Sequence, residues 1–214
     1  MALDDDLNEA LTPLHFGFNA GLWAGVIDLQ ISRVKPIEDM ATRYFGAWKA
    51  IQDGQPTAEQ VAINDELQAA LVIDPEADRA FKVFLHPTVS RDAVMLLVAM
   101  RGLLASADQM IKQAKPLGKD AALRRAVDAF TDSQPLVKLF RDVLIHSDEY
   151  SVGLGRHRHR ATNPDEGITV SQGDDGTILV TWGGHTLHLL QAANDSLTLW
   201  RALRHEYWGK LLGN

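Results

Sequence analysis

Hydrophobic positions recur with helical spacing through most of the first 155 residues. The periodicity predicts helices at residues 19–34, 37–51, 57–72, 75–84, 90–115 and 119–130. Pro36, the turn at residues 53–56 and Pro116 separate them, because proline and glycine interrupt helices. Thr57-Ala58-Glu59-Gln60 matches a capping box. A further helix begins near Pro135 and ends at Gly153.

The pattern changes after Gly155, where hydrophobic and polar residues alternate. Residues 168–171, 177–182 and 185–190 read as strands joined by glycine-containing turns. Asp195 or Ser196 then caps a last helix. The sequence therefore predicts a mainly α fold: a helical bundle, a small three-stranded antiparallel β meander and a closing helix. We expect residues 1–155 to form the bundle and residues 156–214 to pack on it as one globular unit.

Composition narrows the function classes. Of the 214 residues, 46% are hydrophobic, which suits a sizeable core, and the absence of cysteine excludes thiol nucleophiles and cysteine-ligated metals. A net charge of -7 disfavours non-specific duplex DNA binding. The acidic start is unlike a secretory signal, and the longest apolar run, Val94–Ala107, is too short to span a bilayer. We expect a cytoplasmic protein without a membrane segment.

The chemically richest segment is the predicted helix that contains Arg141, Asp142 and His146. At about 100° per residue these three side chains share one arc of the helix, opposite an arc of leucine, valine and phenylalanine. Asp142 and His146 are four residues apart, so the carboxylate can orient the imidazole. Arginine grips phosphate and histidine transfers protons near neutral pH. The set suits metal-independent phosphodiester cleavage by a neighbouring 2′-hydroxyl.

The polar arc also contains one hydrophobic residue, Ile145. A large apolar side chain there indicates that this face of the helix packs against a partner, such as a second copy of the chain. Single exposed apolar residues are common on protein surfaces, and an Arg-Asp-His set can also be an ordinary solvated face.

The Arg141-Asp142-x3-His146 pattern, late in a helical bundle, resembles the R-x4–6-H motif of the HEPN superfamily. The longer string from Arg141 to Tyr150 is similar to an R-[ND]-x3-H-x-D-E pattern in uncharacterised bacterial helical proteins. The resemblance implies an all-α bundle that often dimerises, with the two motif helices meeting at the dimer interface. In ribonuclease members it implies metal-independent cleavage, with Arg141, Asp142 and His146 as the active-site set. Many members are non-catalytic, and the β meander is no part of the family's core fold.

Three further features bear on a site. Arg156, Arg158 and Arg160 form a dense basic run after the motif helix, which reads as a phosphate or RNA clamp or as a flexible charged loop. The histidine pairs 157/159 and 185/188 lack a carboxylate at a recognised spacing, so we predict no metal and no cofactor. Arg101, inside the most apolar helix, needs a partner; we expect an ion pair with Asp142 or Glu149, the alternative being a place in the phosphate site.

These observations lead to two hypotheses. The first is a HEPN-like, metal-independent endoribonuclease of the toxin or defence type, with Arg141, Asp142 and His146 as catalytic residues and RNA as substrate. The second is a non-catalytic homodimeric interaction module that uses the same helix face. In both, we expect a homodimer through the motif-helix face.

Overall fold

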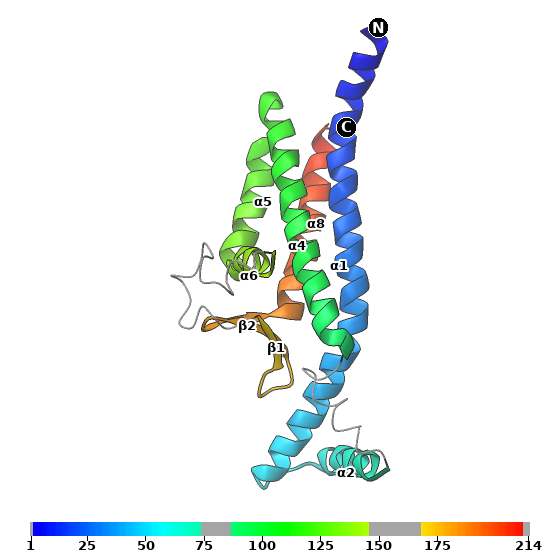
Figure 1. Ribbon diagram of the computed structural model, residues 1–214, viewed down its shortest axis with the longest axis vertical. Coiled ribbons are helices and arrows are strands. Elements are labelled where there is room, and N and C mark those ends of the chain that lie inside the picture. Colours follow the sequence, from blue (N-terminus) through cyan, green and yellow to red (C-terminus); the bar gives the residue numbers. More distant parts are fainter. Residues whose placement is uncertain (1, 74–86, 146–167, 212–214) are drawn as a thin grey trace. The chain divides into compact units, whose positions relative to one another are not determined.

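The chain folds into α-helices with a three-stranded antiparallel sheet before the last helix, which confirms the predicted fold class (Figure 1). The structure is a computed structural model that describes residues 2–73, 87–145 and 168–211. The predicted helix at 75–84 lies outside these residues. The elements are α1 (Ala2–Gln52), α2 (Ala58–Ile73), α4 (Pro87–Ala114), the 3₁₀ turn η2 (Lys115–Leu117), α5 (Asp120–Ser133), α6 (Leu136–Ile145), β1 (Thr169–Gln172), β2 (Ile178–Trp182), β3 (His185–His188) and α8 (Leu189–Leu211).

One compact unit is a helical bundle. It comprises Met1–Leu29, Leu96–Asp142 and Gln191–Asn214, and so holds the first part of α1, most of α4, α5, most of α6 and most of α8. Figure 1 shows α1, α4, α5 and α8 running alongside one another in this unit, with α6 lying across them. Burial of each large apolar side chain contributes about 1.5–3 kcal/mol. The core includes Ile27, Leu97, Met100, Leu103, Met110, Leu123, Phe140, Leu203 and Tyr207.

Tryptophan rings packed on glycines bring the bundle helices close together. The Trp23 ring of α1 lies directly over Gly102 of α4. A Cβ atom placed on Gly17 of α1 would come within 2.7 Å of Cζ2 of Trp208 on α8. Glycine is therefore required at these contacts by space, not by backbone conformation.

The second compact unit comprises Gln30–Met95 and Val143–Leu190 and contains the rest of α1, α2, the start of α4 and the sheet. The predicted capping box opens α2: the Thr57 amide donates to Gln60 Oε1 at 2.8 Å, and the Gln60 amide donates to Thr57 Oγ1 at 3.2 Å. The predicted division near residue 155 falls among residues that the structure leaves undescribed, and it stays a prediction.

Asp92 of α4 is a buried acid in this second unit, with only 2% of its surface exposed. Arg33 Nε lies 3.3 Å from its Oδ2 atom, and Arg91 Nε lies 3.6 Å from Oδ1. A buried carboxylate is costly unless it is paired, and here two guanidinium groups supply the opposite charge.

The predicted break at Pro36 was wrong. A single helix, α1, runs from Ala2 to Gln52 through Pro36. Proline costs a helix one hydrogen bond and some steric strain. Burial on both sides compensates, since Val34 is 0% and Ala41 2% exposed, and an ion pair of 2.7 Å joins Lys35 to Asp39 across the proline.

The predicted start of the last helix was also wrong. α8 begins at Leu189, directly after β3, several residues before the expected cap at Asp195 or Ser196. Ser196 is fully buried, and its hydroxyl donates to the Ala192 carbonyl at 2.8 Å, one turn back inside the helix. Asp195 accepts a hydrogen bond of 2.7 Å from Gln134 Nε2. Both polar side chains therefore serve helix packing, and a serine bonded one turn back is compatible with a helix interior.

The sheet is held against the second part of α1 within the second unit. The strands pair in the order β1-β2-β3, and the Ile178 amide of β2 donates to Glu38 Oε2 at 2.6 Å. Gly176, with φ of 89°, lies against the backbone of Thr42, where a side chain has no room. Burial raises the pKa of the Glu38 carboxyl above its ordinary value, and the Ile178 amide opposes that rise only in part.

Helix α4 is longer than the apolar run that the sequence marks. The span Val89–Leu117, which joins α4 to the 3₁₀ turn η2, is long and apolar enough to cross a bilayer by length and composition. Half of its most apolar window is buried inside the protein, which is the pattern of a central bundle helix. The absence of a membrane segment stays a prediction.

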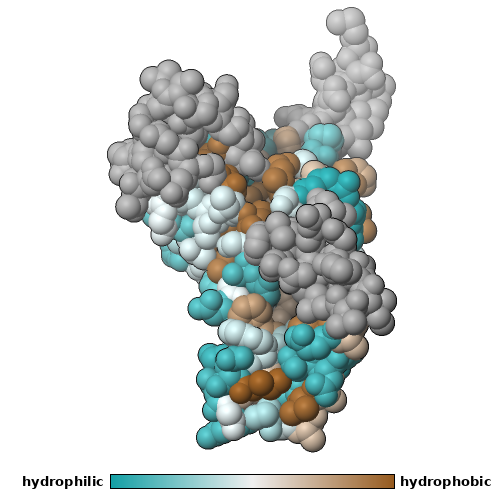
Figure 2. All heavy atoms as spheres, turned by 60° about the horizontal axis from the view of Figure 1, so that its bottom comes forward, coloured by the Kyte–Doolittle hydropathy of each residue, from teal (hydrophilic) through white to brown (hydrophobic). Residues whose placement is uncertain are grey.

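On the face that Figure 2 shows, hydrophobic residues reach the surface in separate small areas among hydrophilic ones. Separately from that view, three exposed hydrophobic residues of α1 follow a regular spacing: Phe18, Leu22 and Leu29 are 63%, 53% and 56% exposed. With Gly25, which is also exposed, they form one narrow line along the helix, here called the α1 stripe (Phe18, Leu22, Gly25, Leu29). The first part of α1 is therefore apolar on two opposite sides, and the bundle covers one of them.

Candidate functional site

Helix α6 carries the motif residues, and its burial pattern follows the predicted wheel on the apolar side. Val137, Leu139, Phe140 and Val143 are at most 2% exposed, so this side of α6 anchors the helix in the core. Arg141 and Asp142 lie in the last described turn. His146, Arg156, Arg158 and Arg160 lie outside the described residues, as does Glu149, so their predicted roles stay predictions.

Arg141 and Asp142 form an ion pair. Arg141 Nη1 donates to Asp142 Oδ1 at 2.8 Å, with 27% of the arginine side chain and 11% of the aspartate side chain exposed. The arginine stem is long enough to bring its guanidinium onto the adjacent carboxylate. The contact occupies one of the five N–H groups of the guanidinium and holds the group in one orientation.

The polar arc of α6 contains one buried residue. Asp142 lies near the middle of that arc, yet only 8% of its surface is exposed. A carboxylate is rarely buried unless it is paired. Lys138 on the same arc is exposed, so the inference from Ile145 that this face packs against a partner stays a prediction.

A cavity of about 190 Å³ opens one turn before Arg141 on α6, between α4, α5 and α6 of the bundle unit. Its polar wall is made by Arg101, Thr131, Gln134 and Lys138, with Asp108 also on the wall. Its apolar floor is Leu104, Val127 and Phe130. The sequence placed Lys138 on the polar arc of α6 but gave no sign that it shares a cavity with Arg101.

The expected ion pair between Arg101 and Asp142 is not among the ion pairs of the described residues, in which Asp142 pairs with Arg141, and the alternative partner Glu149 lies outside those residues. Within residues 2–73, 87–145 and 168–211, no carboxylate lies within ion-pair distance of Arg101 or Lys138. The Nε atom of Arg101 is buried and has no hydrogen-bond partner in the part of the chain that the structure describes. An orphaned donor of this kind inside a protein costs stability, so its presence needs a reason.

Side-chain hydrogen bonds fix two residues of the cavity wall. Gln134 Nε2 donates to Asp195 of α8 at 2.7 Å, and Thr131 Oγ1 donates to the Val127 carbonyl at 2.9 Å. These bonds fix the positions of the Thr131 hydroxyl and the Gln134 amide. Arg101 and Lys138 line the same cavity. Two cations and one acid line the cavity, so its wall carries a net positive charge although the chain as a whole is acidic.

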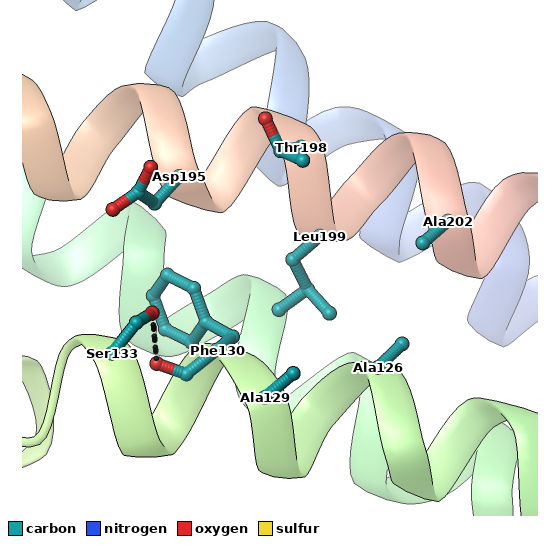
Figure 3. Close-up of a pocket in the computed structure, with 8 residues that line it drawn as sticks. All are labelled: Ala126, Ala129, Phe130, Ser133, Asp195, Thr198, Leu199 and Ala202. Atoms are coloured by element: carbon teal, nitrogen blue, oxygen red, sulfur yellow. Dashed lines mark hydrogen bonds between the residues drawn. The ribbon is translucent and has the colours of Figure 1, made fainter.

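A second, larger pocket of about 320 Å³ lies between α5 and α8 (Figure 3). Small side chains line much of it, and Figure 3 shows Phe130 and Leu199 in the space between the two helices. The Ser133 hydroxyl donates to the Phe130 carbonyl at 3.0 Å, and the pocket's acid, Asp195, already bonds Gln134. This pocket offers shape without reactive groups.

Histidine and acid residues do not gather into a metal site in the part of the chain that the structure describes. His185 and His188 lie three apart on β3, which puts them on opposite faces of the strand as the sequence predicted. The 157/159 pair lies outside the described residues, so the predicted absence of a metal stays untested.

No family model, no curated protein and no solved structure matches this chain.

Proposed function

We propose that this protein is a HEPN-like, metal-independent endoribonuclease of the toxin or defence type that works in the cytoplasm as a homodimer. The observation that carries the proposal is the oriented pair of Arg141 and Asp142, 2.8 Å apart in a partly buried turn of α6 and one turn before His146 in the chain. The resemblance of the motif to HEPN ribonucleases supports it, and so does the positive cavity beside it.

In this proposal Arg141 binds the phosphate that is cut. Asp142 holds one N–H of the guanidinium, and the remaining donors are available to the phosphate oxygens, where negative charge grows in the transition state. Partial burial strengthens that attraction, because the surroundings are less polarisable than water. Arg156, Arg158 and Arg160 hold the flanking RNA phosphates.

His146 transfers protons in the proposed reaction. A base removes the proton of the 2′-hydroxyl, whose oxygen attacks the adjacent phosphorus, and an acid protonates the departing 5′-oxygen. The products are a 2′,3′-cyclic phosphate and a 5′-hydroxyl. In a homodimer that pairs two motif helices, the two His146 side chains share the base and acid roles, and Ile145 lies at the contact.

The test is cleavage of single-stranded RNA in excess chelator. Arg141→Ala and His146→Ala are each expected to lower the rate by about 10²–10⁴-fold, the usual contribution of a general acid–base or of an oxyanion donor. Arg125→Ala and His205→Ala, which remove exposed side chains of the same types on α5 and α8, are expected to leave the rate unchanged.

A rate that is equal in wild type, Arg141→Ala and His146→Ala would mean that this helix does not cut RNA. Cleavage that disappears in chelator would contradict the metal-independent mechanism. Products with a linear 3′-phosphate from the first instant would contradict attack by the 2′-hydroxyl.

The α1 stripe favours a second candidate function, a non-catalytic homodimeric interaction module. The positions 18, 22, 25 and 29 follow the alternating four- and three-residue spacing of a coiled-coil seam. Nothing lies within 4 Å of where a Gly25 side chain would begin, which leaves room for an approaching helix. A second copy offers the same stripe, so the surface is self-complementary.

The oligomeric state of charge variants, measured by sedimentation, shows which of the two proposed surfaces forms the dimer. Loss of the dimer in Leu22→Asp, with Ile145→Asp still dimeric, favours the α1 stripe and the interaction module. The reverse result favours pairing of the motif helices and the ribonuclease. Val61→Asp, which places the same charge on an exposed apolar position of α2, is the control and should stay dimeric. A monomeric wild type contradicts both.

A further inference from the structure

The cavity beside the motif turn has the composition of an anion site. Arg101 and Lys138 bring two positive charges to one wall, and no acid within the described ranges neutralises either of them. The Nε atom of Arg101 is buried and has no hydrogen-bond partner among the described residues, so that part of the fold does not compensate this guanidinium. A cavity with two such cations on its wall suits a partner that accepts hydrogen bonds and carries negative charge.

The size and lining narrow the class of ligand. At about 190 Å³ the cavity is below the range of about 300–1,000 Å³ that suits drug-sized molecules. The Arg101 guanidinium, the Lys138 ammonium and the second N–H of the Gln134 amide match the oxygens of a phosphate, whereas the one hydroxyl proton of Thr131 is already donated to the Val127 carbonyl. Leu104, Val127 and Phe130 beneath them keep the local dielectric low and strengthen the attraction.

The place of the cavity on α6 links it to the motif. Lys138 precedes Arg141 by three residues, so the two side chains lie on neighbouring positions of one helix face, about one turn apart. A chain of phosphates bound at Arg141 would pass this wall.

We propose that Arg101 and Lys138, with the free N–H of the Gln134 amide, form a subsite for a single phosphate group. Resting on the proposed ribonuclease function, we assign it to an RNA phosphate next to the one that is cut. Arg101 and Lys138 bind the oxygens and do not take part in bond breaking. Asp108 on the wall limits the affinity by repelling the anion.

Titration calorimetry with inorganic phosphate, and separately with a short RNA made uncleavable by 2′-deoxy substitution, tests the subsite without requiring activity. Lys138→Gln and Arg101→Met are expected to weaken binding of both probes about tenfold or more, as loss of a charged hydrogen bond does. Lys112→Gln, an exposed lysine of α4 away from the cavity, is the control and should bind like wild type.

Asp108→Asn supplies a test in the opposite direction. Removing the one acid of the wall is expected to tighten phosphate binding about threefold, since an anion is attracted more strongly to a more positive site. A residue that merely supported the fold would not improve binding when changed. Because the Lys138 side chain is exposed, the Lys138→Gln variant should fold like wild type, and an unchanged melting temperature would verify this.

The outcomes separate this subsite from the proposed function. Binding that is the same in wild type, Lys138→Gln and Arg101→Met overturns the subsite, even if RNA is cut. If Lys138→Gln and Arg101→Met weaken binding of both probes and Asp108→Asn tightens it, in a protein that cuts no RNA, the phosphate site is supported and the ribonuclease function is contradicted. Binding of inorganic phosphate but not of the RNA probe overturns the assignment to an RNA phosphate.

Discussion

Helix α4 contains Asp92 in the second unit and Arg101 in the bundle unit, and the surroundings of these two charged residues differ. In the second unit, Asp92 is 2% exposed and has arginine atoms at 3.3 Å and 3.6 Å. In the bundle unit, Arg101 has a buried Nε without a hydrogen-bond partner and no ion pair with any described carboxylate. Asp92 thus has opposite charges beside it, although its Oδ1 atom, like Arg101 Nε, has no hydrogen-bond partner, whereas Arg101 has no opposite charge within ion-pair distance among the described residues.

The difference shows how a structural charge can be told from one kept for a ligand. A compensated buried charge stabilises the fold only as long as its partner is present. An uncompensated charge in a cavity lowers stability, and it is expected to persist where binding requires it. The comparison therefore predicts opposite responses to removal of an arginine in the two regions.

Removal of the arginine beside Asp92 should have the largest effect. Arg33→Met leaves a buried carboxylate with only Arg91 nearby, and we expect the free energy of unfolding to fall by about 3 kcal/mol, the low end for breaking a buried pair. Urea denaturation measures it. Arg43→Met, which breaks an exposed pair 3.8 Å from Glu66, should cost about 0–1 kcal/mol. Equal losses in the two variants would mean that Asp92 does not depend on Arg33.

The packing next to Arg101 can be tested at Gly102. Gly102→Ala places a methyl group against the Trp23 ring and should lower the free energy of unfolding by about 1–3 kcal/mol, as overpacking does. Gly25→Ala, on the exposed side of α1 with open space around it, should raise stability by about 0.5–1 kcal/mol through better helix propensity. Destabilisation by both would show that the α1 stripe is already covered.

Removal of Arg101 should have a smaller and opposite effect on stability. Arg101→Met keeps most of the side-chain volume and removes the orphaned donor, so thermal or urea unfolding should show stability unchanged within about 1 kcal/mol, or increased. A loss of about 3 kcal/mol, like that expected for Arg33→Met, would mean that Arg101 is a structural residue. The contrast between the two regions would then disappear.

The smallest effect concerns the pH dependence of the second unit. Burial raises the pKa of Glu38 above its ordinary value of 4.5, so the folded protein holds this proton more tightly than the unfolded chain. The stabilisation from this proton is complete below 4.5 and is lost as the pH rises through the raised pKa. Glu38→Gln should remove this fall, so the stability of wild type relative to the variant should decrease with rising pH. A difference that stays flat, or that increases, would contradict the assignment.

Much of the fold follows from hydrophobic periodicity and turn residues. The capping box at Thr57 and the two turns of the sheet involve neighbouring residues, so the sequence determines them locally. Pro36 and Ser196 misled the prediction because distant packing overrides local preference: burial around Val34 and Ala41 carries α1 through the proline, and Ser196 finds its partner one turn back.

The candidate site was predictable only in part. The polar arc of α6 can be read from one helix, because Arg141 and Asp142 are neighbours in sequence. The cavity requires α4, α5 and α6 to meet, and no local pattern places Arg101 beside Lys138 or leaves it without an acid. No local pattern indicated either that Asp142 pairs with its neighbour Arg141 and not with Arg101 of another helix.

The central claim is that the motif turn of α6 cuts RNA through the 2′-hydroxyl without a metal. The most direct measurement uses an oligodeoxynucleotide with a single ribonucleotide, incubated with wild-type protein and excess chelator. We predict one cut, directly after the ribonucleotide, that leaves a 2′,3′-cyclic phosphate and is absent with Arg141→Ala. An intact oligonucleotide, a cut between deoxynucleotides, or equal cutting by Arg141→Ala would contradict the claim.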